Sequence, residues 1–366
     1  MLRSDHSIIS VRPDGSDPIV FAEGDEVVLG RAQPTWSPDG GEVAWTEQIG
    51  EDSHELVIAT ADGVEHSRAG APMLAQYLDW SPNGEAIAFM GNDFWGAMTL
   101  AFAETGADAS IIDDGAPMYI DWNPDSESLL VHIEDRFEII EMDGGARASI
   151  PTDGEFRVGT HVGGRIIYSV DGGGIGEVLT IADAGGQNPR ALIRFTAPAA
   201  VVADDTTSRL ALMSTWTREG VEIRESAPTD LPVLIPEQLV VLDLESGDAR
   251  LVAEGRAVSW AWSPDGAHLL YSTVEFDGDS QRIVWYSWDG TTSTRYGVFT
   301  PSSRFGNGYL AFFDQHERSV TLWSPDSRAF VYAGGTAGAA SGIWVQPVRG
   351  DAPVLVTEGI YATWSP

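Results

Sequence analysis

One five-residue unit recurs along the chain, and it constrains the fold more than any other feature. Trp262-Ser263-Pro264-Asp265-Gly266 reads as the end of a strand followed by a tight turn, because such a turn favours Ser, Pro, Asp and Gly in this order. Residues 267–272 are mostly apolar, rich in strand formers and without helical spacing, so they predict a second strand. The unit therefore predicts two strands joined by one turn.

This unit is repeated at long, fairly regular intervals. Copies begin at Trp36, Trp80, Trp122, Trp262 and Trp323, and Trp364-Ser365-Pro366 opens another. Two further units keep the frame without the Trp, since Gly159 lies nine residues before Tyr168 and Ala203 lies nine before Leu212. The resulting spacings of roughly 40 to 60 residues match single four-stranded blades of a β-propeller, with insertions in two of them.

Each unit also predicts an outer hairpin, because a glycine turn follows the second strand. Glycine supplies the positive φ that tight hairpins need. The predicted turns contain Gly15, Gly63, Gly106, Gly144, Gly186, Gly247, Gly290 and Gly350. Eight such turns predict an all-β chain in which residues 1–366 form one eight-bladed propeller of four-stranded antiparallel blades, with seven blades as the alternative.

The two ends of the chain are predicted to share one blade. Residues 8–12 and 18–22 read as its outer strands, and residues 360–364 read as its inner strand. Closure by both termini would remove exposed sheet edges. The second strand of this blade is missing from the pattern, so the blade is either three-stranded or completed by residues that precede Met1.

The repeated Trp-Ser-Pro-Asp-Gly unit resembles the TolB-like β-propellers, whose blades carry this PD40 or WD40-like repeat. The resemblance covers essentially the whole chain. Residues 115–118, 129–132 and 312–315 resemble one bacterial branch of that family. The resemblance implies a binding or scaffolding protein of the periplasm or the exterior, although the N-terminus of this chain does not read as a signal peptide. It implies nothing about chemistry, because the repeat is structural.

The composition restricts the partners. The chain carries 21 Lys and Arg against 55 Asp and Glu, a formal charge of −34, and all of its basic residues are arginines. Such a surface repels nucleic acid and anionic membranes, and no apolar run is long enough to span a membrane. Cysteine is absent, which excludes disulfides, thiolate metal sites and a Cys nucleophile. We expect a monomer.

The sequence contains few motifs that indicate catalysis or metal binding. No Gly-x-Ser-x-Gly elbow occurs, and the blades leave no room for a hydrolase domain. The seven histidines form no zinc motif, so no cofactor is expected. Ca²⁺ could bind either of two acidic loops, that of Glu275, Asp277 and Asp279 or that of Glu47, Glu51 and Asp52. Neither has the spacing of a dedicated calcium loop, and a solvated loop is the simpler interpretation. The repeated Trp is interpreted as packing between blades, and Asp39, Asp125, Asp265 and Asp326 as forming turn hydrogen bonds.

The two longest insertions predict a binding site. In a four-stranded blade, the loops between second and third strands and those between blades leave on one face, so Thr217 to Gln238 and Gly297 to Ser319 should flank one blade there. The loop from Gly91 to Gly96 should share that face. Aromatic and polar residues in these loops are typical of interface anchors. The predicted ligand-binding residues are Phe94, Trp95, Arg224, Arg304, Phe305, Phe313, Asp314, Gln315 and His316.

Two functions follow as hypotheses. The first is a non-enzymatic protein- or peptide-binding propeller that uses the insertion-bearing face. The alternative is a metal-assisted lyase or hydrolase at the mouth of the central channel, because propellers host such sites even though a fold does not determine function. The residues expected near that mouth are Asp79, Asp121, Asp314 and His316. The Phe residues of the second insertion are equally well explained as anchors of their own loop.

Overall fold

The computed structural model describes the chain except for residues 25–29, 33, 93–95, 143–146, 152–158, 172–176, 196–198, 205, 215–230, 278–279, 337–340 and 351. Strands make up 56% of it and helices 5%, so the all-β prediction is confirmed. The chain divides into two compact units. Unit 1 comprises Met1–Gly115, Phe276–Val284 and Tyr296–Pro366, and unit 2 comprises Ala116–Glu275 and Trp285–Arg295. The single domain over residues 1–366 stays a prediction.

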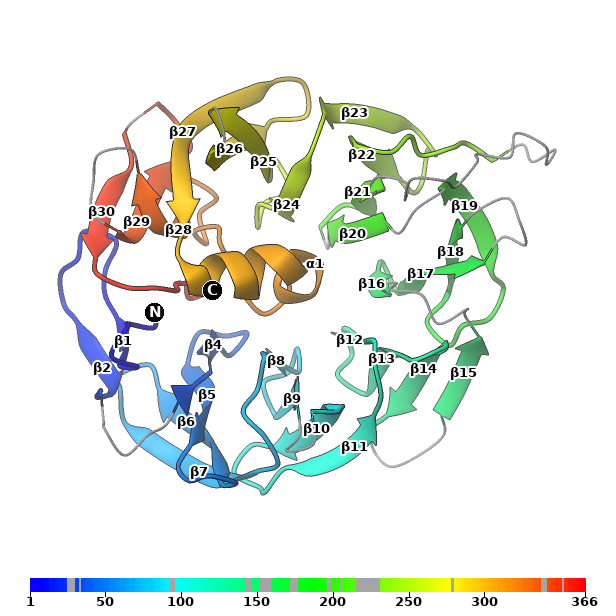
Figure 1. The fold of residues 1–366 in the computed structure, drawn as a ribbon. Coiled ribbons are helices and arrows are strands. Elements are labelled where there is room, and N and C mark those ends of the chain that lie inside the picture. The colour runs from blue at the N-terminus through cyan, green and yellow to red at the C-terminus, as the bar shows by residue number, and fades with distance from the viewer. Residues whose placement is uncertain are drawn as a thin grey trace. The chain divides into compact units, whose positions relative to one another are not determined.

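Consecutive strands of unit 1 pair antiparallel in small sheets, as the repeat predicts (Figure 1). Its strands are β1 (Ile8–Ser10), β2 (Ile19–Ala22), β3 (Gly30–Arg31), β4 (Thr35–Trp36), β5 (Glu42–Gln48), β6 (His54–Thr60), β7 (Glu65–Ala71), β8 (Tyr77–Trp80), β9 (Ala86–Asn92), β10 (Met98–Glu104), β11 (Ser110–Asp114), β28 (Ala329–Thr336), β29 (Gly342–Pro347) and β30 (Val354–Thr357). The interior between the sheets β3–β7 and β8–β11 is one apolar cluster that includes Ile58, Ile87 and Phe89.

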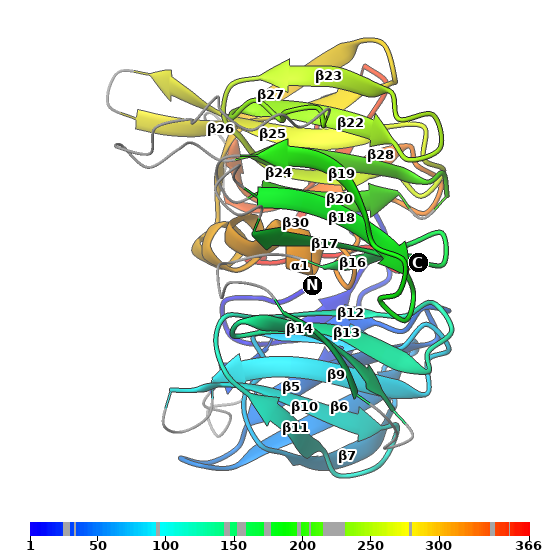
Figure 2. The ribbon, with the colours of Figure 1, turned by 90° about the vertical axis from the view of Figure 1, so that its right-hand side faces the viewer.

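Unit 2 follows the same plan, with sheets in the orders β12 to β15, β16 to β19 and β20 to β23 (Figure 2). Its strands are β12 (Met118–Trp122), β13 (Ser128–Ile133), β14 (Arg136–Glu141), β15 (Arg147–Pro151), β16 (Thr160–Val162), β17 (Arg165–Asp171), β18 (Glu177–Asp183), β19 (Arg190–Phe195), β20 (Ala199–Asp204), β21 (Arg209–Ser214), β22 (Gln238–Asp243), β23 (Ala249–Glu254) and β24 (Ala257–Trp262). An apolar cluster fills the space between the last two of these sheets.

Three long strands continue from β24: β25 (Leu269–Asp277), β26 (Ser280–Trp288) and β27 (Ser293–Pro301). The end of β27 also pairs with β28, from Phe299 opposite Thr336 to Pro301 opposite Gly334. Strands β24 to β30 therefore follow one another in a single hydrogen-bonded order. The sequence predicted separate blades here, and the extra pairing arises because β27 is longer than a typical strand.

The recurring turn forms as its residues predict. Ser263 Oγ donates to Asp265 Oδ1 at 2.7 Å, and the same oxygen accepts the N–H of Ala267 at 3.0 Å. The corresponding Ser-to-Asp bonds, from Ser37 to Asp39 and from Ser324 to Asp326, are also 2.7 Å long. The serine hydroxyl bond lowers the pKa of both of those aspartates. The aspartates therefore stabilise turns.

The outer hairpin turns are confirmed too. The predicted glycines have φ between 74° and 93°, apart from Gly144, which lies outside the described residues. This left-handed conformation is costly for residues with a Cβ. The repeated tryptophans pack as predicted between repeats. Trp80 Nε1 donates to Thr35 O in β4, and Trp262 Nε1 donates to Val202 O in β20, each at 3.4 Å. Each indole thus reaches back to the inner strand of an earlier repeat.

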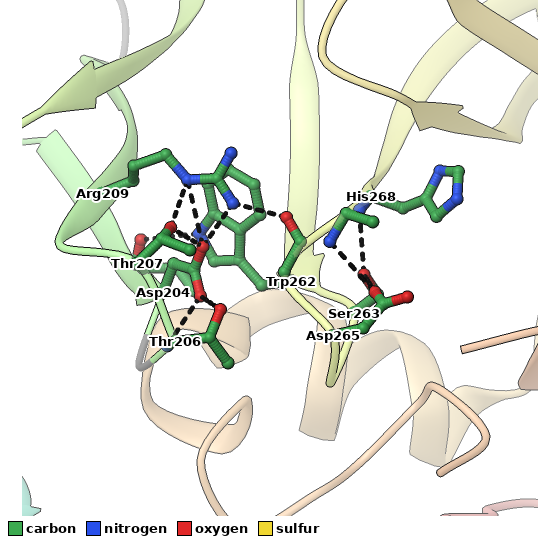
Figure 3. Close-up of polar contacts among 11 residues, drawn as sticks. Asp204, Thr206, Thr207, Arg209, Trp262, Ser263, Asp265 and His268 are labelled. Atoms are coloured by element: carbon green, nitrogen blue, oxygen red, sulfur yellow. Dashed lines mark hydrogen bonds and ion pairs between the residues drawn. The ribbon is translucent and has the colours of Figure 1, made fainter. Parts of the chain in front are cut away.

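The repeat with Ala203 in place of Trp has a different link to the repeat that follows it (Figure 3). Arg209 Nη2 donates to Asp204 Oδ2 and to Gly266 O, each at 2.5 Å. Thr206 and Thr207 also donate to Asp204, whose side chain is buried. An arginine therefore joins this repeat to the Gly266 turn of the next.

The terminal segments meet in unit 1, but in a different pattern from the predicted one. The Leu2 N–H donates to Tyr361 O at 2.9 Å, and the Ile9 N–H donates to Met1 O at 3.0 Å. Leu2 forms isolated bridges to Tyr361 and Ile8. The predicted inner strand over residues 360–364 is therefore wrong, because this segment contributes one bridge only. Leu2 therefore contacts both the C-terminal segment and β1.

The described end of the first insertion joins the edge of a sheet in unit 2. The Arg194 N–H in β19 donates to Pro232 O at 3.0 Å, and the Leu234 N–H donates to Arg194 O at 2.8 Å. Leu234 is buried in the apolar cluster of this unit, while Val233 and Ile235 are exposed. Most of the predicted insertion Thr217 to Gln238 lies outside the described residues.

Candidate functional site: the helical insertion

The second predicted insertion is helical, whereas the sequence predicted an irregular loop. We call residues 302–320 the helical insertion. It consists of a π-helix (Phe305–Tyr309), a 3₁₀-helix (Leu310–Phe312) and α1 (Phe313–His316). Ser302 starts it, since its hydroxyl accepts the Phe305 N–H at 3.1 Å. The Glu317 N–H donates to Phe313 O at 2.7 Å and closes the last turn.

Hydrogen bonds fix both ends of the insertion to other parts of unit 1. Ser302 Oγ donates to Ile360 O at 2.5 Å, and the Ser302 N–H donates to Ala333 O of β28 at 3.0 Å. At the other end, Thr35 Oγ1 of β4 donates to Ser319 O at 2.7 Å. The insertion is therefore a fixed part of unit 1, and just beyond its end the Trp364 N–H of the C-terminal segment donates to Thr321 O at 2.9 Å.

Buried aromatic rings anchor the insertion to unit 1. Phe305 stacks on Tyr309 with 5.3 Å between ring centroids and 4° between planes. The His316 ring lies 6.2 Å from Tyr309 and meets Tyr77 of β8 edge-on at 5.2 Å. All four side chains are buried. These rings give the short helices a core of their own, which the low helix propensity of their two glycines would not supply.

Six of the nine predicted ligand-binding residues lie on this insertion. Phe305, Phe313, Gln315 and His316 are buried, and Arg304 and Asp314 are half-buried. Direct ligand contact by these residues stays a prediction. The other three, Phe94, Trp95 and Arg224, lie outside the described residues. The exposed aromatic side chain of the insertion is Phe312, which is 46% exposed and was not among the predicted ligand residues. Two adjacent phenylalanines give no sequence signal for which one faces out.

Burial controls the charge of the insertion. It lowers the pKa of His316 to about 3, and the charge of Arg304 acts in the same direction, so the imidazole is neutral at pH 7. Burial raises the pKa of Asp314 to about 6. Burial also raises the pKa of Tyr77, and the negative charge of Asp79 adds to that rise. At neutral pH the insertion combines a neutral histidine with a carboxylate that is costly to ionise.

The residues expected at a channel mouth fall into both units. Asp79, Asp314 and His316 belong to unit 1. Asp121 belongs to unit 2, where its Oδ2 accepts the His161 N–H at 2.5 Å and lies 2.9 Å from His161 Nδ1. Both side chains of this pair are buried. Asp121 thus joins the inner strands β12 and β16, a contact that the sequence pattern did not reveal.

Metal binding has no further support in the part of the chain that the structure describes. There, no group of three or more His, Cys, Asp and Glu side chains is arranged to hold an ion. In the first of the two acidic loops, Glu275 Oε2 pairs with Arg295 Nη2 at 2.8 Å, while residues 278–279 lie outside the described ranges. The metal-dependent hypothesis stays a prediction. The described helices include none that is long and apolar enough to cross a membrane.

Comparisons with known proteins identify the fold. No protein-family model and no curated protein matches the sequence. The β-propeller domain of the Trilobed protease from Pyrococcus furiosus is similar in structure, with a TM-score of 0.53 and 15% identity over 91% of this chain and 95% of that chain. A prolyl endopeptidase structure gives a TM-score of 0.55 and 14% identity, over 92% of this chain and 50% of that one.

TolB from Acinetobacter baumannii is also similar, at 15% identity over 70% of this chain and 64% of that chain, with a TM-score of 0.44. At these identities a structural likeness shows a fold and leaves function open. The small antiparallel sheets and the first two similarities together establish that the chain has a β-propeller fold.

Proposed function

We propose that this protein is a non-enzymatic binding or scaffolding β-propeller, and that a protein or peptide partner contacts the helical insertion. One observation carries the proposal: buried rings and both end contacts fix the insertion in place, while Phe312 stays 46% exposed. Rigid scaffolds that present an exposed aromatic residue lose little entropy on binding. Arg304 and Asp314, which are half-buried, supply polar groups on the same segment.

The binding proposal is tested by replacing Phe312 with a photo-crosslinking aromatic residue and irradiating the cells that make the protein. We expect one major adduct. The same probe at Asp326, in a turn of the repeat, should give none. The partner captured at position 312 should then bind the wild type and lose affinity at least tenfold for Phe312→Ser.

Phe276→Ser provides the matched control, because Phe276 is another exposed aromatic, at 62%. A partner that tolerates Phe312→Ser, or that crosslinks from position 326 instead, would overturn the proposal. Equal loss with both variants would show non-specific apolar adhesion and would also overturn it.

We further propose eight blades, the last of which is completed by both termini. The contacts of Leu2 with Tyr361 and Ile8 support this arrangement. The propeller of the Trilobed protease is described as having an open velcro topology, so structural similarity does not decide the question. Removing residues 360–366 should lower the melting temperature markedly, because it also removes the acceptor Ile360 O of Ser302. A truncated protein that melts with the full-length chain would contradict closure.

A further inference from the structure

Two tyrosine hydroxyls and one arginine nitrogen are buried around the helical insertion without a hydrogen-bond partner. They are Tyr309 Oη, Tyr361 Oη and Arg304 Nε, and none of the three has a partner among the described residues. The side chains of Tyr309 and Tyr361 have no exposed surface at all. A buried hydroxyl with no partner is costly, and most buried polar groups in proteins are paired. Three such atoms in one region point to a bound species.

The three residues are neighbours in space. The bond from Ser302 Oγ to Ile360 O, 2.5 Å long, sets the start of the insertion beside Tyr361. Tyr309 stacks on Phe305, the residue that follows Arg304, at 5.3 Å. The charge of Arg304 also reaches Tyr361, since it offsets part of the rise in pKa that burial causes in that hydroxyl. The residues that carry the two hydroxyls and the guanidinium therefore lie close together in unit 1.

The chemistry of this group favours an anion. A guanidinium only donates hydrogen bonds, and both tyrosine hydroxyls can donate as well. Arg304 is half-buried and its Nε has no hydrogen-bond partner among the described residues, whereas a buried charge needs a counter-charge. Burial raises the pKa of the Tyr309 hydroxyl, and the charges of Glu317 and Asp314 add to that rise, so the positive charge of the group lies at Arg304.

We propose that Arg304, Tyr309 and Tyr361 bind one small anion of chloride size inside unit 1. The size follows from burial: both tyrosines have no exposed surface, so a carboxylate attached to a peptide could reach them only if the insertion opened. The anion would supply the acceptor that all three donors lack. It would thereby help to hold the insertion against the C-terminal segment.

The test compares melting temperatures in sodium chloride and in sodium gluconate at equal ionic strength, so that charge screening is the same in both. The wild type should melt higher in chloride, and this increment should saturate as chloride rises, as ligand binding to the folded state requires. Tyr361→Phe and Arg304→Gln should lose most of the increment. In gluconate, Tyr361→Phe should be neutral or stabilising, because it deletes a buried hydroxyl that has no partner there.

Matched controls separate this effect from general changes. Tyr332→Phe removes another buried hydroxyl of unit 1, and Arg349→Gln removes an exposed arginine; both should keep the full chloride increment. Crystals soaked in bromide should show an anomalous peak between Arg304 and Tyr361. An increment that all variants share, an increment produced by acetate and not by chloride, or bromide peaks only elsewhere would overturn the proposal. Internal water alone would give no anion dependence and would overturn it as well.

Discussion

The guanidinium of Arg209 lies over the indole of Trp262, with 4.4 Å between the guanidinium carbon and the ring centroid. The same guanidinium binds Asp204, whose side chain is only 1% exposed, and the carbonyl of Gly266 (Figure 3). One side chain thus combines a cation–π contact, an ion pair and a backbone bond. It links two consecutive repeats of unit 2 at the point where the first of them lacks its tryptophan.

Replacing Arg209 with Ala should therefore cost about 2–4 kcal/mol, because it leaves the buried carboxylate of Asp204 without its cation. Urea denaturation measures the change in the free energy of unfolding. Arg12→Ala is the control, since both side chains of the Arg12–Asp17 pair are about 70% exposed. It should cost less than about 1 kcal/mol. Equal costs for the two variants would show that the Arg209 contacts contribute little.

The Gly266 turn gives a second prediction. Gly266 has φ of 64°, and a Cβ at this position would overlap Thr206 Oγ1 and lie 3.1 Å from Asp204 Oδ2. Gly84 occupies the same place in another repeat, with φ of 73°, but a Cβ there would meet only Pro38, at 3.9 Å.

Gly84→Ala should thus cost about 1–2 kcal/mol from backbone strain alone. Gly266→Ala should cost more, because it also displaces Thr206, which donates to Asp204, and the Asp204 carboxylate that binds Arg209. Thermal melting of both variants tests this order. A Gly266→Ala protein as stable as the Gly84→Ala protein would show that the turn adjusts freely.

The repeats were predictable from the sequence because their causes are local. Turn type depends on a few adjacent residues such as Ser37 and Asp39, and a strand shows itself by composition over a short window. The strand predicted over residues 267–272 forms as Leu269–Asp277, because pairing with its neighbours lengthens it beyond its most apolar residues.

The helical insertion was not predictable in this way. Its sequence contains Gly306 and Gly308 and lacks a helical apolar stripe, so local preferences favour a loop. It is helical because Thr35 and Ile360 hold its ends, and both are far away in sequence. Tertiary contacts therefore determine the conformation of the segment on which the candidate site lies.

Long-range packing also explains one lost tryptophan. A Cβ on Gly159 would meet Leu130 and Phe137, each at 2.8 Å. Phe137 occupies the space that a larger side chain at Gly159 would need, and its ring packs at a tilt against that of His132, with 4.6 Å between centroids. The equal spacing of Gly159 within the repeat was visible in the sequence, but the reason for its identity lies on other strands.

The formal charge of −34 gives a prediction for the whole molecule. Mutual repulsion of surface carboxylates should weaken as salt shortens the Debye length from ~30 Å at 0.01 M to ~3 Å at 1 M. The melting temperature should rise over this range in sodium chloride and in sodium gluconate alike. Changing the exposed residues Glu104, Glu141 and Glu245 to Gln should reduce the slope. A flat curve in both salts would mean that the charges are too dispersed to affect stability.

Asp314 provides a prediction whose sign depends on pH. Burial raises its pKa to about 6, whereas an unfolded chain has an ordinary carboxyl pKa of about 4. Between these values the folded protein binds more protons than the unfolded one, so the contribution of Asp314 to stability falls as pH rises from about 4 to about 6. Above that range the folded state must hold a half-buried charge.

Asp314→Asn removes this charge, so at pH 7.5 it should raise the free energy of unfolding by about 1–2 kcal/mol. The gain should vanish near pH 4, where the wild-type carboxyl is protonated when folded. Asp326→Asn is the control of opposite sign, because the Ser324 hydroxyl lowers the pKa of Asp326 and its charged form is the favoured one. That variant should lose stability at pH 7.5.

His316 determines how stability depends on pH on the acid side, because burial lowers its pKa to about 3. Below about pH 6.5 this imidazole becomes protonated in the unfolded chain but stays neutral in the folded protein. The free energy of unfolding therefore falls as pH falls. Asp314→Asn should leave this acid limb in place, and Asp314→Asn with His316→Gln should flatten it. Urea denaturation at pH 4, 5.5 and 7.5 distinguishes the two groups. A gain from Asp314→Asn that is the same at all three pH values would show that ionisation of Asp314 is not its cause.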